Sequence, residues 1–230
     1  MMTEEQKLGL ELRFRPKNSA AVWSGLFASL LAWEPRLQPT HVEKPSHRYL
    51  QEPEPWTPEM VAELADKCAG KERFVWTLLG VDEGFAMSFE RRLVEVAVSI
   101  AMPRPSAPLP SFFLTLLDAL QGSIQPSLAM LFDLYSNQDA KAVWQGLRSL
   151  GDVPPILYLD EWAVERAGGR ERLHNAPCEV LDMPDGGLLL IIRLSLWDAP
   201  TAADIERKQA VEQHLGVSKE RPLLFIEPDS

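Results

Sequence analysis

Hydrophobic and polar residues alternate near the start of the chain at the two-residue period of a β-strand. The apolar positions are Leu8, Leu10, Leu12 and Phe14, and the positions between them are Gly9, Glu11, Arg13 and Arg15. This pattern predicts a half-buried strand that ends at Pro16. Apolar residues then recur at helical spacing from Val22 to Leu31, and Asn18 or Ser19 is suited to cap the start of that helix.

Residues 35–58 contain six prolines, a composition that resists both a helix and a central strand. We predict an extended surface segment that wraps the domain, and the alternative is a recognition arm of polyproline type. A helix is expected to begin at Thr57 and Pro58 and to end at Gly70. Cys68 lies on the apolar face of that helix, which indicates a core residue and not a reactive thiol.

The next stretch, residues 73–102, is typical of an antiparallel meander. Its last strand runs from Val94 to Met102, with one apolar face and one face of small or polar residues. The proline-rich segment 103–110 follows. Ser111 is then expected to cap a helix that ends at Gly122.

Short helices and strands alternate in the C-terminal half. An apolar run spans residues 128–132, and a helix is expected from about Asp139. A short strand is predicted at 156–159, followed by a short helix that closes at Gly168.

A β-hairpin and a final helix follow these elements. The hairpin turns on Asp185-Gly186-Gly187, and the run from Leu188 to Leu196 is apolar enough for a central strand. The last helix begins at Pro200 and Thr201, and its predicted inward side chains are Ile205, Val211 and Leu215. The final ten residues are expected to add an edge strand.

These elements predict a single α+β domain over residues 1–230, with a mainly antiparallel sheet flanked by helices. The segments 35–58 and 103–110 are expected on its surface. With 46% apolar residues, the chain can bury a substantial core. Two cysteines give no disulfide framework, and no secretion signal or bilayer-spanning run is recognised. We therefore expect a cytoplasmic protein without a membrane association.

The charge of the chain is −10, and it is unevenly distributed. Residues 1–115 carry 15 acids against 13 bases, whereas residues 116–230 carry 18 acids against 10 bases. Within residues 152–206 the balance is 11 acids against four bases. Such acidity favours a basic protein as the partner, and it disfavours direct binding of nucleic acid, because phosphates are contacted by Lys and Arg.

Sequence motifs of catalysis are missing. The sequence has no dinucleotide-binding glycine motif, no P-loop, no nucleophile elbow and no HExxH. His174 and Cys178 together supply at most two of the three or four ligands that a metal site needs. We therefore predict a binding protein and not an enzyme, with no catalytic residue, metal or cofactor. Its oligomeric state stays open, with a homodimer as one arrangement.

The acidic segment supplies the candidate partner-binding residues. They are Asp160, Glu161, Trp162, Glu165, Asp182 and Asp185. Glu161 and Glu165 are four residues apart on a predicted helix, a like-charge spacing that costs a few tenths of a kcal/mol and that a basic partner relieves. Trp162 is the candidate aromatic anchor of the interface.

Other readings of the same residues are open. A solvated helix face neutralised by Arg166, Arg170 or Arg172 explains any one of the acids, and Asp185 is a typical turn residue before two glycines. A metal-dependent hydrolase would use Asp160, Glu161 and Asp182 as hard ligands. A non-catalytic adaptor would dock through the segment 35–58.

The order of elements in the last third of the chain carries a family resemblance. The stretch PPILYLDEWAVERAG is followed by the hairpin strand GGLLLIIRLSLWDAP and the helix TAADIERKQAVEQHLG. Across residues 150–216 this layout resembles the immunity protein 52 family of bacterial polymorphic toxin and type VI secretion systems. Those proteins also begin with a strand and an amphipathic helix, as residues 8–33 do. The resemblance implies an intracellular antitoxin that binds and neutralises a cognate nuclease effector.

Overall fold

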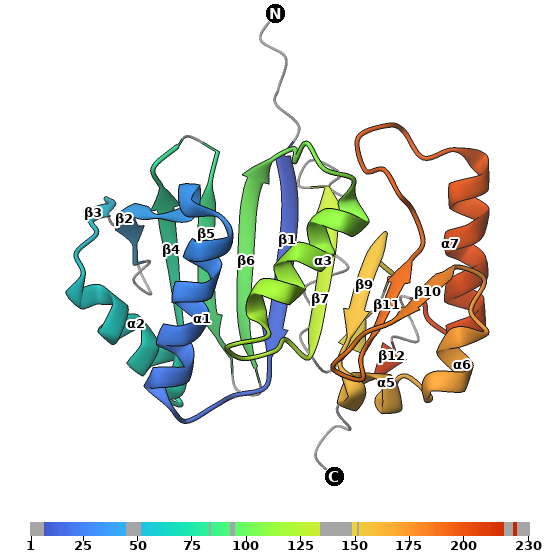
Figure 1. Ribbon diagram of the computed structural model, residues 1–230, viewed down its shortest axis with the longest axis horizontal. Helices are drawn as coiled ribbons and strands as arrows, with labels where there is room; N and C mark the ends of the chain where they lie inside the picture. The colour runs from blue at the N-terminus through green and yellow to red at the C-terminus, as the bar shows by residue number, and fades with distance from the viewer. Residues whose placement is uncertain are drawn as a thin grey trace, which may run out of the picture.

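A ten-stranded antiparallel sheet organises the molecule (Figure 1). The computed structural model describes residues 7–44, 52–82, 84–92, 95–133, 149–150, 152–218 and 223–224. The strand order is β10-β11-β9-β7-β1-β6-β5-β4-β2-β3. These strands are β1 (Lys7–Phe14), β2 (Pro39–Glu43), β3 (Glu54–Pro55), β4 (Phe74–Gly80), β5 (Ala86–Arg91), β6 (Val96–Pro103), β7 (Leu128–Asp133), β9 (Ile156–Leu159), β10 (Glu179–Asp182) and β11 (Leu188–Ile191). The predicted α+β fold with an antiparallel sheet is confirmed.

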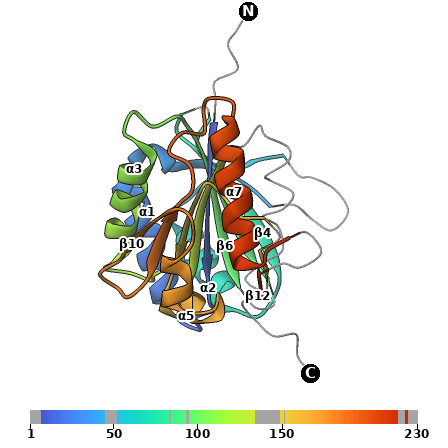
Figure 2. The ribbon, with the colours of Figure 1, turned by 90° about the vertical axis from the view of Figure 1, so that its right-hand side faces the viewer.

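Helices cover both faces of this sheet. In Figure 2, α1 and α3 lie on one side of the sheet and α7 lies on the other. The helices packed on the first face are α1 (Ala20–Trp33), α2 (Glu59–Ala69) and α3 (Leu109–Leu120). Those packed on the second face, over the C-terminal strands, are α5 (Glu161–Arg166), α6 (Arg170–His174) and α7 (Ala202–Leu215). A short 3-10 helix, η1 (Pro35–Leu37), joins α1 to β2.

Alternation along the strands divides the core into two clusters. On β11, Leu189 and Ile191 join the cluster beneath α1, α2 and α3. Leu188 and Leu190 join the cluster beneath α5, α6 and α7. A strand that is apolar on both faces needs a covering layer on each side. The apolar run of β11 therefore explains why both faces of this strand are buried in hydrophobic clusters.

Strand β1 lies at the centre of the sheet, so the prediction that it is half-buried is wrong. It pairs with β6 on one side and β7 on the other. Glu11 and Arg13 are both 0% exposed, and the Nε atom of Arg13 lies 2.6 Å from Oε1 of Glu11. Burial raises the pKa of Glu11, although the charge of Arg13 acts in the opposite direction. Arg92 forms ion pairs with Glu90 and with the buried Glu95 near the same place.

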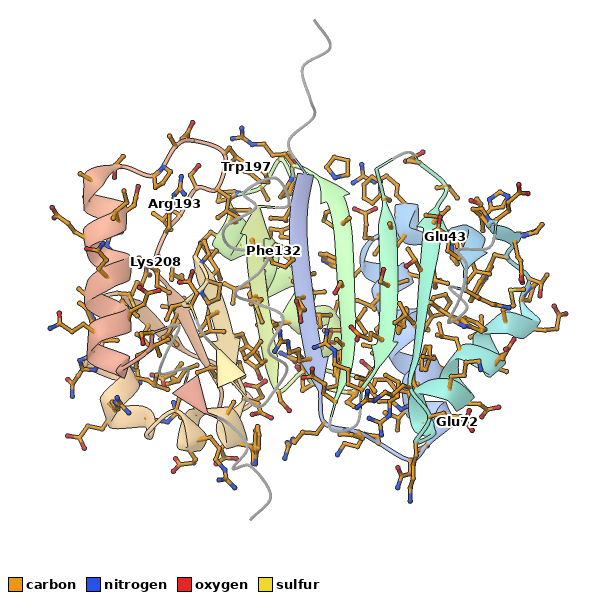
Figure 3. All side chains as sticks on the ribbon, turned by 180° about the vertical axis from the view of Figure 1, so that it is seen from behind. Glu43, Glu72, Phe132, Arg193, Trp197 and Lys208 are labelled. Atoms are coloured by element: carbon orange, nitrogen blue, oxygen red, sulfur yellow. The ribbon has the colours of Figure 1, made fainter. Side chains whose placement is uncertain are left out.

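A close aromatic contact lies on the same face of the sheet as Glu11 and Arg13. The ring of Phe132 on β7 packs against Gly9 of β1, and a Cβ atom on the glycine would lie 2.4 Å from that ring. Figure 3 views the sheet from this side and labels Phe132. A side chain at position 9 would displace the ring, so the glycine is required by the close approach.

The proline-rich segments are more structured than predicted. Within 35–58, Pro39–Glu43 and Glu54–Pro55 form strands β2 and β3 at one edge of the sheet. Proline is compatible with an edge strand, because such a strand needs main-chain donors on one side only. Helix α3 begins at Leu109, so the prediction of an N-cap at Ser111 is wrong. Pro110 lies in the first turn, where its missing N–H removes no helical hydrogen bond.

Three predictions for the C-terminal half also need correction. The strand predicted from Leu188 to Leu196 ends at Ile191. Ile205 is 46% exposed and not inward, although Val211 and Leu215 are buried as expected. The C-terminal strand β12 (Leu223–Leu224) pairs with β8 (Ser149–Leu150) in a separate sheet and does not extend the large one.

The other predicted helix boundaries agree with the structure where it describes them. Ser19 is the N-cap of α1, Gly70 follows α2, and Thr201 caps α7 with its side chain. Val94 and the helix predicted from Asp139 lie outside the described residues. Among the described helices, none has the length and apolar character that a bilayer crossing requires.

Candidate partner-binding site

The sheet brings the predicted acidic residues to one end of its C-terminal half. Strand β9 leads directly into α5, and its last residue, Leu159, pairs with Leu188 just after the β10-β11 turn. The turn therefore lies beside the first residues of α5. The Cβ position of Gly186 is 3.8 Å from Cβ of Glu161, which places the two segments in contact. We call Asp160, Glu161, Glu165, Asp182 and Asp185 the acidic patch.

Asp160 has a local structural role. It is the N-cap of α5, and its Oδ1 atom accepts a hydrogen bond from the main-chain N–H of Ala163 at 2.7 Å. Its Oδ2 atom lies 3.1 Å from Nη2 of Arg15, which comes from the end of β1. Burial raises the pKa of Asp160 despite the hydrogen bond from Ala163 and the charge of Arg15. Most of the bonding capacity of this carboxylate is therefore used within the chain.

Asp185 and Asp182 also have partners within the chain. Asp185 accepts hydrogen bonds from the hydroxyl of Tyr158 at 2.6 Å and from the main-chain N–H of Gly187 at 2.9 Å. The alternative of a turn residue is therefore correct for the geometry of Asp185. Asp182 pairs with Arg170 and lies 3.2 Å from Nε2 of His174. The side chain of Asp182 is still 62% exposed.

Trp162 is half-buried and lies between two arginines. Its ring centroid is 5.3 Å from Cζ of Arg15 and 5.9 Å from Cζ of Arg166. The indole also packs against the hydrophobic cluster beneath α5, α6 and α7. A cation above an aromatic face contributes about 0.5 to 1 kcal/mol at an exposed site. Trp162 is thus partly used to fix α5 against β1.

Glu161 and Glu165 differ from the other members of the acidic patch. Both side chains are exposed on α5, one turn apart. Within the described ranges, neither carboxylate has a hydrogen bond or an ion pair. Arg170 and Arg172 are directed elsewhere, because Arg170 binds Asp182 and the Gly186 carbonyl, and Arg172 donates to the His214 carbonyl. These two glutamates are the acids of the patch that are available to a partner.

The carboxylates proposed for a metal-dependent hydrolase do not converge. Asp160 caps a helix and Asp182 binds Arg170, so both hold partners within the chain. Among the described residues, no group of three or more His, Cys, Asp or Glu side chains is placed to hold a metal ion. His174 faces Asp182, and burial raises the pKa of Cys178 to about 11. A thiol with that pKa is a poor nucleophile at neutral pH.

Three residues at this end of the molecule are not recognisable from the sequence. Arg15 pairs with Asp160 and stacks on Trp162, and Ser127 accepts a hydrogen bond from Nε of Arg15 at 3.1 Å. Tyr158 is fully buried and donates to Asp185. Arg15 and Ser127 also line a pocket of about 400 Å³ next to α5. Arg15 lies 145 positions from Asp160 in the sequence, so no local pattern predicts their contact.

Comparisons with known proteins give a fold likeness. No known family matches the sequence, and no curated protein matches it. Among solved structures, a T6SS (type VI secretion system) protein of Pseudomonas aeruginosa superposes with a TM-score of 0.59 at 12% identity. The match covers 94% of this chain and 74% of the other. At this identity the likeness shows a shared fold, and the resemblance to the immunity protein 52 family stays a prediction.

Proposed function

We propose that this chain is a non-catalytic immunity protein that binds and neutralises a cognate nuclease effector of a type VI secretion system. The observation that carries the proposal is the exposed pair Glu161 and Glu165, which has no partner within the described residues. The fold likeness to a T6SS protein and the layout shared with immunity proteins support the same biological setting.

The acidic patch has the electrostatics that inhibition of a nuclease needs. A nuclease holds DNA phosphates in a basic cleft, and an acidic surface that occupies the cleft competes with those phosphates. Lys or Arg of the partner would also relieve the repulsion between Glu161 and Glu165, because they are like charges one helical turn apart. Asp160, Asp182 and Asp185 hold α5 and the adjacent turn in place.

The proposal is tested by reversing the two available charges. The partner is first identified by a pull-down of the tagged protein from cells that express the adjacent open reading frames. The double substitution Glu161→Lys and Glu165→Lys should then weaken binding of the recovered nuclease about 100-fold, because two attractive contacts become repulsive. Binding is measured by biolayer interferometry, and protection from the toxin is measured by growth.

A control with the same charge change is present on α2, where Glu63, unlike Glu161 and Glu165, lies 4.0 Å from Nζ of Lys44. Glu59 and Glu63 are also exposed, also four residues apart and on a helix of the other half of the sheet. Their reversal to Lys changes the net charge by the same amount and should leave the affinity within about threefold of wild type. Equal losses in the two double variants would mean that net charge, and not the acidic patch, controls binding.

The salt dependence of the association rate distinguishes long-range electrostatic attraction from short-range contacts at the interface. The association rate of the wild type should fall as salt rises, since screening weakens long-range attraction. The double variant that carries Glu161→Lys and Glu165→Lys should show a much smaller dependence. A salt-insensitive rate for the wild type would indicate a largely apolar interface and would contradict the proposed acidic contact.

A further inference from the structure

The sheet ends on one side with an edge strand whose outward main-chain groups have no hydrogen bond among the described residues. Strand β10 is the last strand of the order, and Figure 2 looks toward this side of the molecule. Glu179 and Asp182 at its two ends are exposed, whereas Val180 and Leu181 between them are half-buried. An edge strand presents unpaired N–H and C=O groups to which another strand can pair.

The register identifies the main-chain groups that point outward. The N–H of Met183 donates to the carbonyl of Gly187, so these two residues form a hydrogen-bonded pair. Hydrogen-bonded and non-hydrogen-bonded pairs alternate in an antiparallel ladder. In the register of β10 and β11, Leu181 and Glu179 therefore bond to β11. Val180 and Asp182 direct their N–H and C=O groups away from the sheet.

The opposite edge of the same sheet is blocked. There, β3 has only two residues, and one of them is Pro55. Pro53 lies immediately before that strand. Short edge strands and prolines are devices that prevent pairing with another chain. By contrast, β10 has four residues and no proline, and exposed charged residues lie at its two ends.

A side-chain pocket opens beside the start of β10. It has a volume of about 490 Å³, and its lining includes Glu179, Ile191, Leu194 and the cation of Arg207. Leu194 is 62% exposed and offers an apolar contact at the rim of this pocket. Peptides that add a strand to a sheet obtain affinity from main-chain hydrogen bonds and specificity from such neighbouring pockets.

We infer that β10 accepts an extended segment of a partner protein, which pairs with Val180 and Asp182 and carries basic and apolar side chains. The basic residues meet the exposed carboxylates of Glu179 and Asp182 at the two ends of β10, and an apolar residue enters the pocket at Leu194. A second copy of this chain fits poorly, because it would bring its own Glu179 and Asp182 to an edge that is already acidic. This inference deepens the proposed function, on which it rests for the choice of a basic protein as partner.

The test uses defined peptides, so it does not depend on the toxin. The probes are an eight-residue peptide of alternating lysine and valine, the same peptide with glutamate in place of lysine, and the lysine peptide N-methylated at every residue. The wild-type chain should bind the lysine peptide at least about tenfold more tightly than either of the others. Affinity is measured by fluorescence anisotropy.

Two substitutions at one position isolate the main-chain contribution. Val180→Pro removes an outward N–H without removing a hydrogen bond to β11, and it should weaken binding of the lysine peptide about tenfold. Val180→Thr keeps the N–H and a β-branched side chain, and it should bind within about twofold of wild type. Circular dichroism verifies the fold of both variants.

The inference is overturned if the N-methylated peptide binds as well as the lysine peptide, if Val180→Pro has no effect, or if no peptide binds. If Val180→Pro does not fold, the comparison of the N-methylated and unmodified peptides on the wild type still decides. Failure of the proposed function is a separate result, since it appears as toxin binding that is unaffected by reversal of Glu161 and Glu165. Peptide binding without such a toxin effect would leave the edge-strand inference standing.

Discussion

The two halves of the sheet place their charged residues in different surroundings. Around β1 and β6, Glu11, Arg13 and Glu95 are fully buried and form ion pairs within the sheet. Around α5, Glu161 and Glu165 are exposed. A buried ion pair costs so much desolvation that it serves as a structural element and is unavailable to a partner. Exposed carboxylates contribute little to folding and can take part in recognition.

The comparison explains why overall acidity is a poor guide to the binding surface. Charges near β1 pair with one another at buried positions, although Oε2 of Glu11 has no hydrogen-bond partner among the described residues. In the C-terminal half, three acids fall between the buried, paired charges and the exposed, unpaired ones. Each of them binds a neighbouring segment of the chain: Asp160, Asp182 and Asp185. We therefore expect a partner to bind at Glu161 and Glu165, the acids of the patch that have no hydrogen bond or ion pair within the described residues.

The largest expected effect is a loss of stability when the buried pair is broken. Arg13→Met leaves the carboxylate of Glu11 buried without its nearest cation, which should destabilise the protein by about 3 to 5 kcal/mol. Urea denaturation measures the change. The double variant Glu11→Leu with Arg13→Met should recover much of that loss, because neither position then carries a charge. Equal stabilities of the wild type and Arg13→Met would contradict a structural role for the pair.

A smaller effect is expected at the contact between β1 and β7. Gly9→Ala places a methyl group where the Phe132 ring lies, and the displacement should cost about 2 kcal/mol. The control is Gly25→Ala in α1, where nothing lies within 4 Å of the added Cβ. That change should stabilise the helix by about 0.5 kcal/mol. Thermal denaturation of both variants checks the prediction, and a neutral Gly9→Ala would show that Phe132 moves freely.

The smallest expected effect is a pH dependence of protein stability that arises from Glu212 in the C-terminal half. Burial and the neighbouring Asp152 raise the pKa of Glu212 from 4.5 to about 7. The folded chain therefore holds a proton that the unfolded chain loses, and stability falls as pH rises from 4.5 to about 7. The pKa of Asp152 is lowered, because its hydrogen bonds to Glu212 and Lys208 outweigh burial, so its own contribution lies below this window.

Glu212→Gln should remove this pH dependence and stabilise the protein by about 1 kcal/mol above pH 7. The amide retains the carbonyl oxygen that accepts from Val153 N–H at 3.3 Å. Glu206→Gln, at an exposed position of the same helix, is the control and should leave the profile unchanged. A wild-type profile that stays flat between pH 5 and 7 would contradict the shared proton of Asp152 and Glu212.

Local patterns predicted the elements well where one short segment decides the outcome. The alternation from Leu8 to Phe14 predicts β1, and the turn at Asp185 predicts the β10-β11 hairpin. Local patterns failed to predict burial where it depends on contacts with segments distant in the sequence. Ile205 was placed inside by its helical spacing, yet the face of α7 that carries it points to solvent. The candidate acids were found by charge, but their separation into paired and available residues needed the structure.

The sequence by itself determined the strand and helix periods, the turns, the absence of a catalytic motif and the acidity of the C-terminal half. These features depend on residues within a few positions of each other or on composition alone. Only the tertiary structure decided that β1 is central, that Arg15 pairs with Asp160 and that β10 is an edge strand. Burial and pairing depend on contacts between segments far apart in the chain, and no local pattern encodes which of those contacts form.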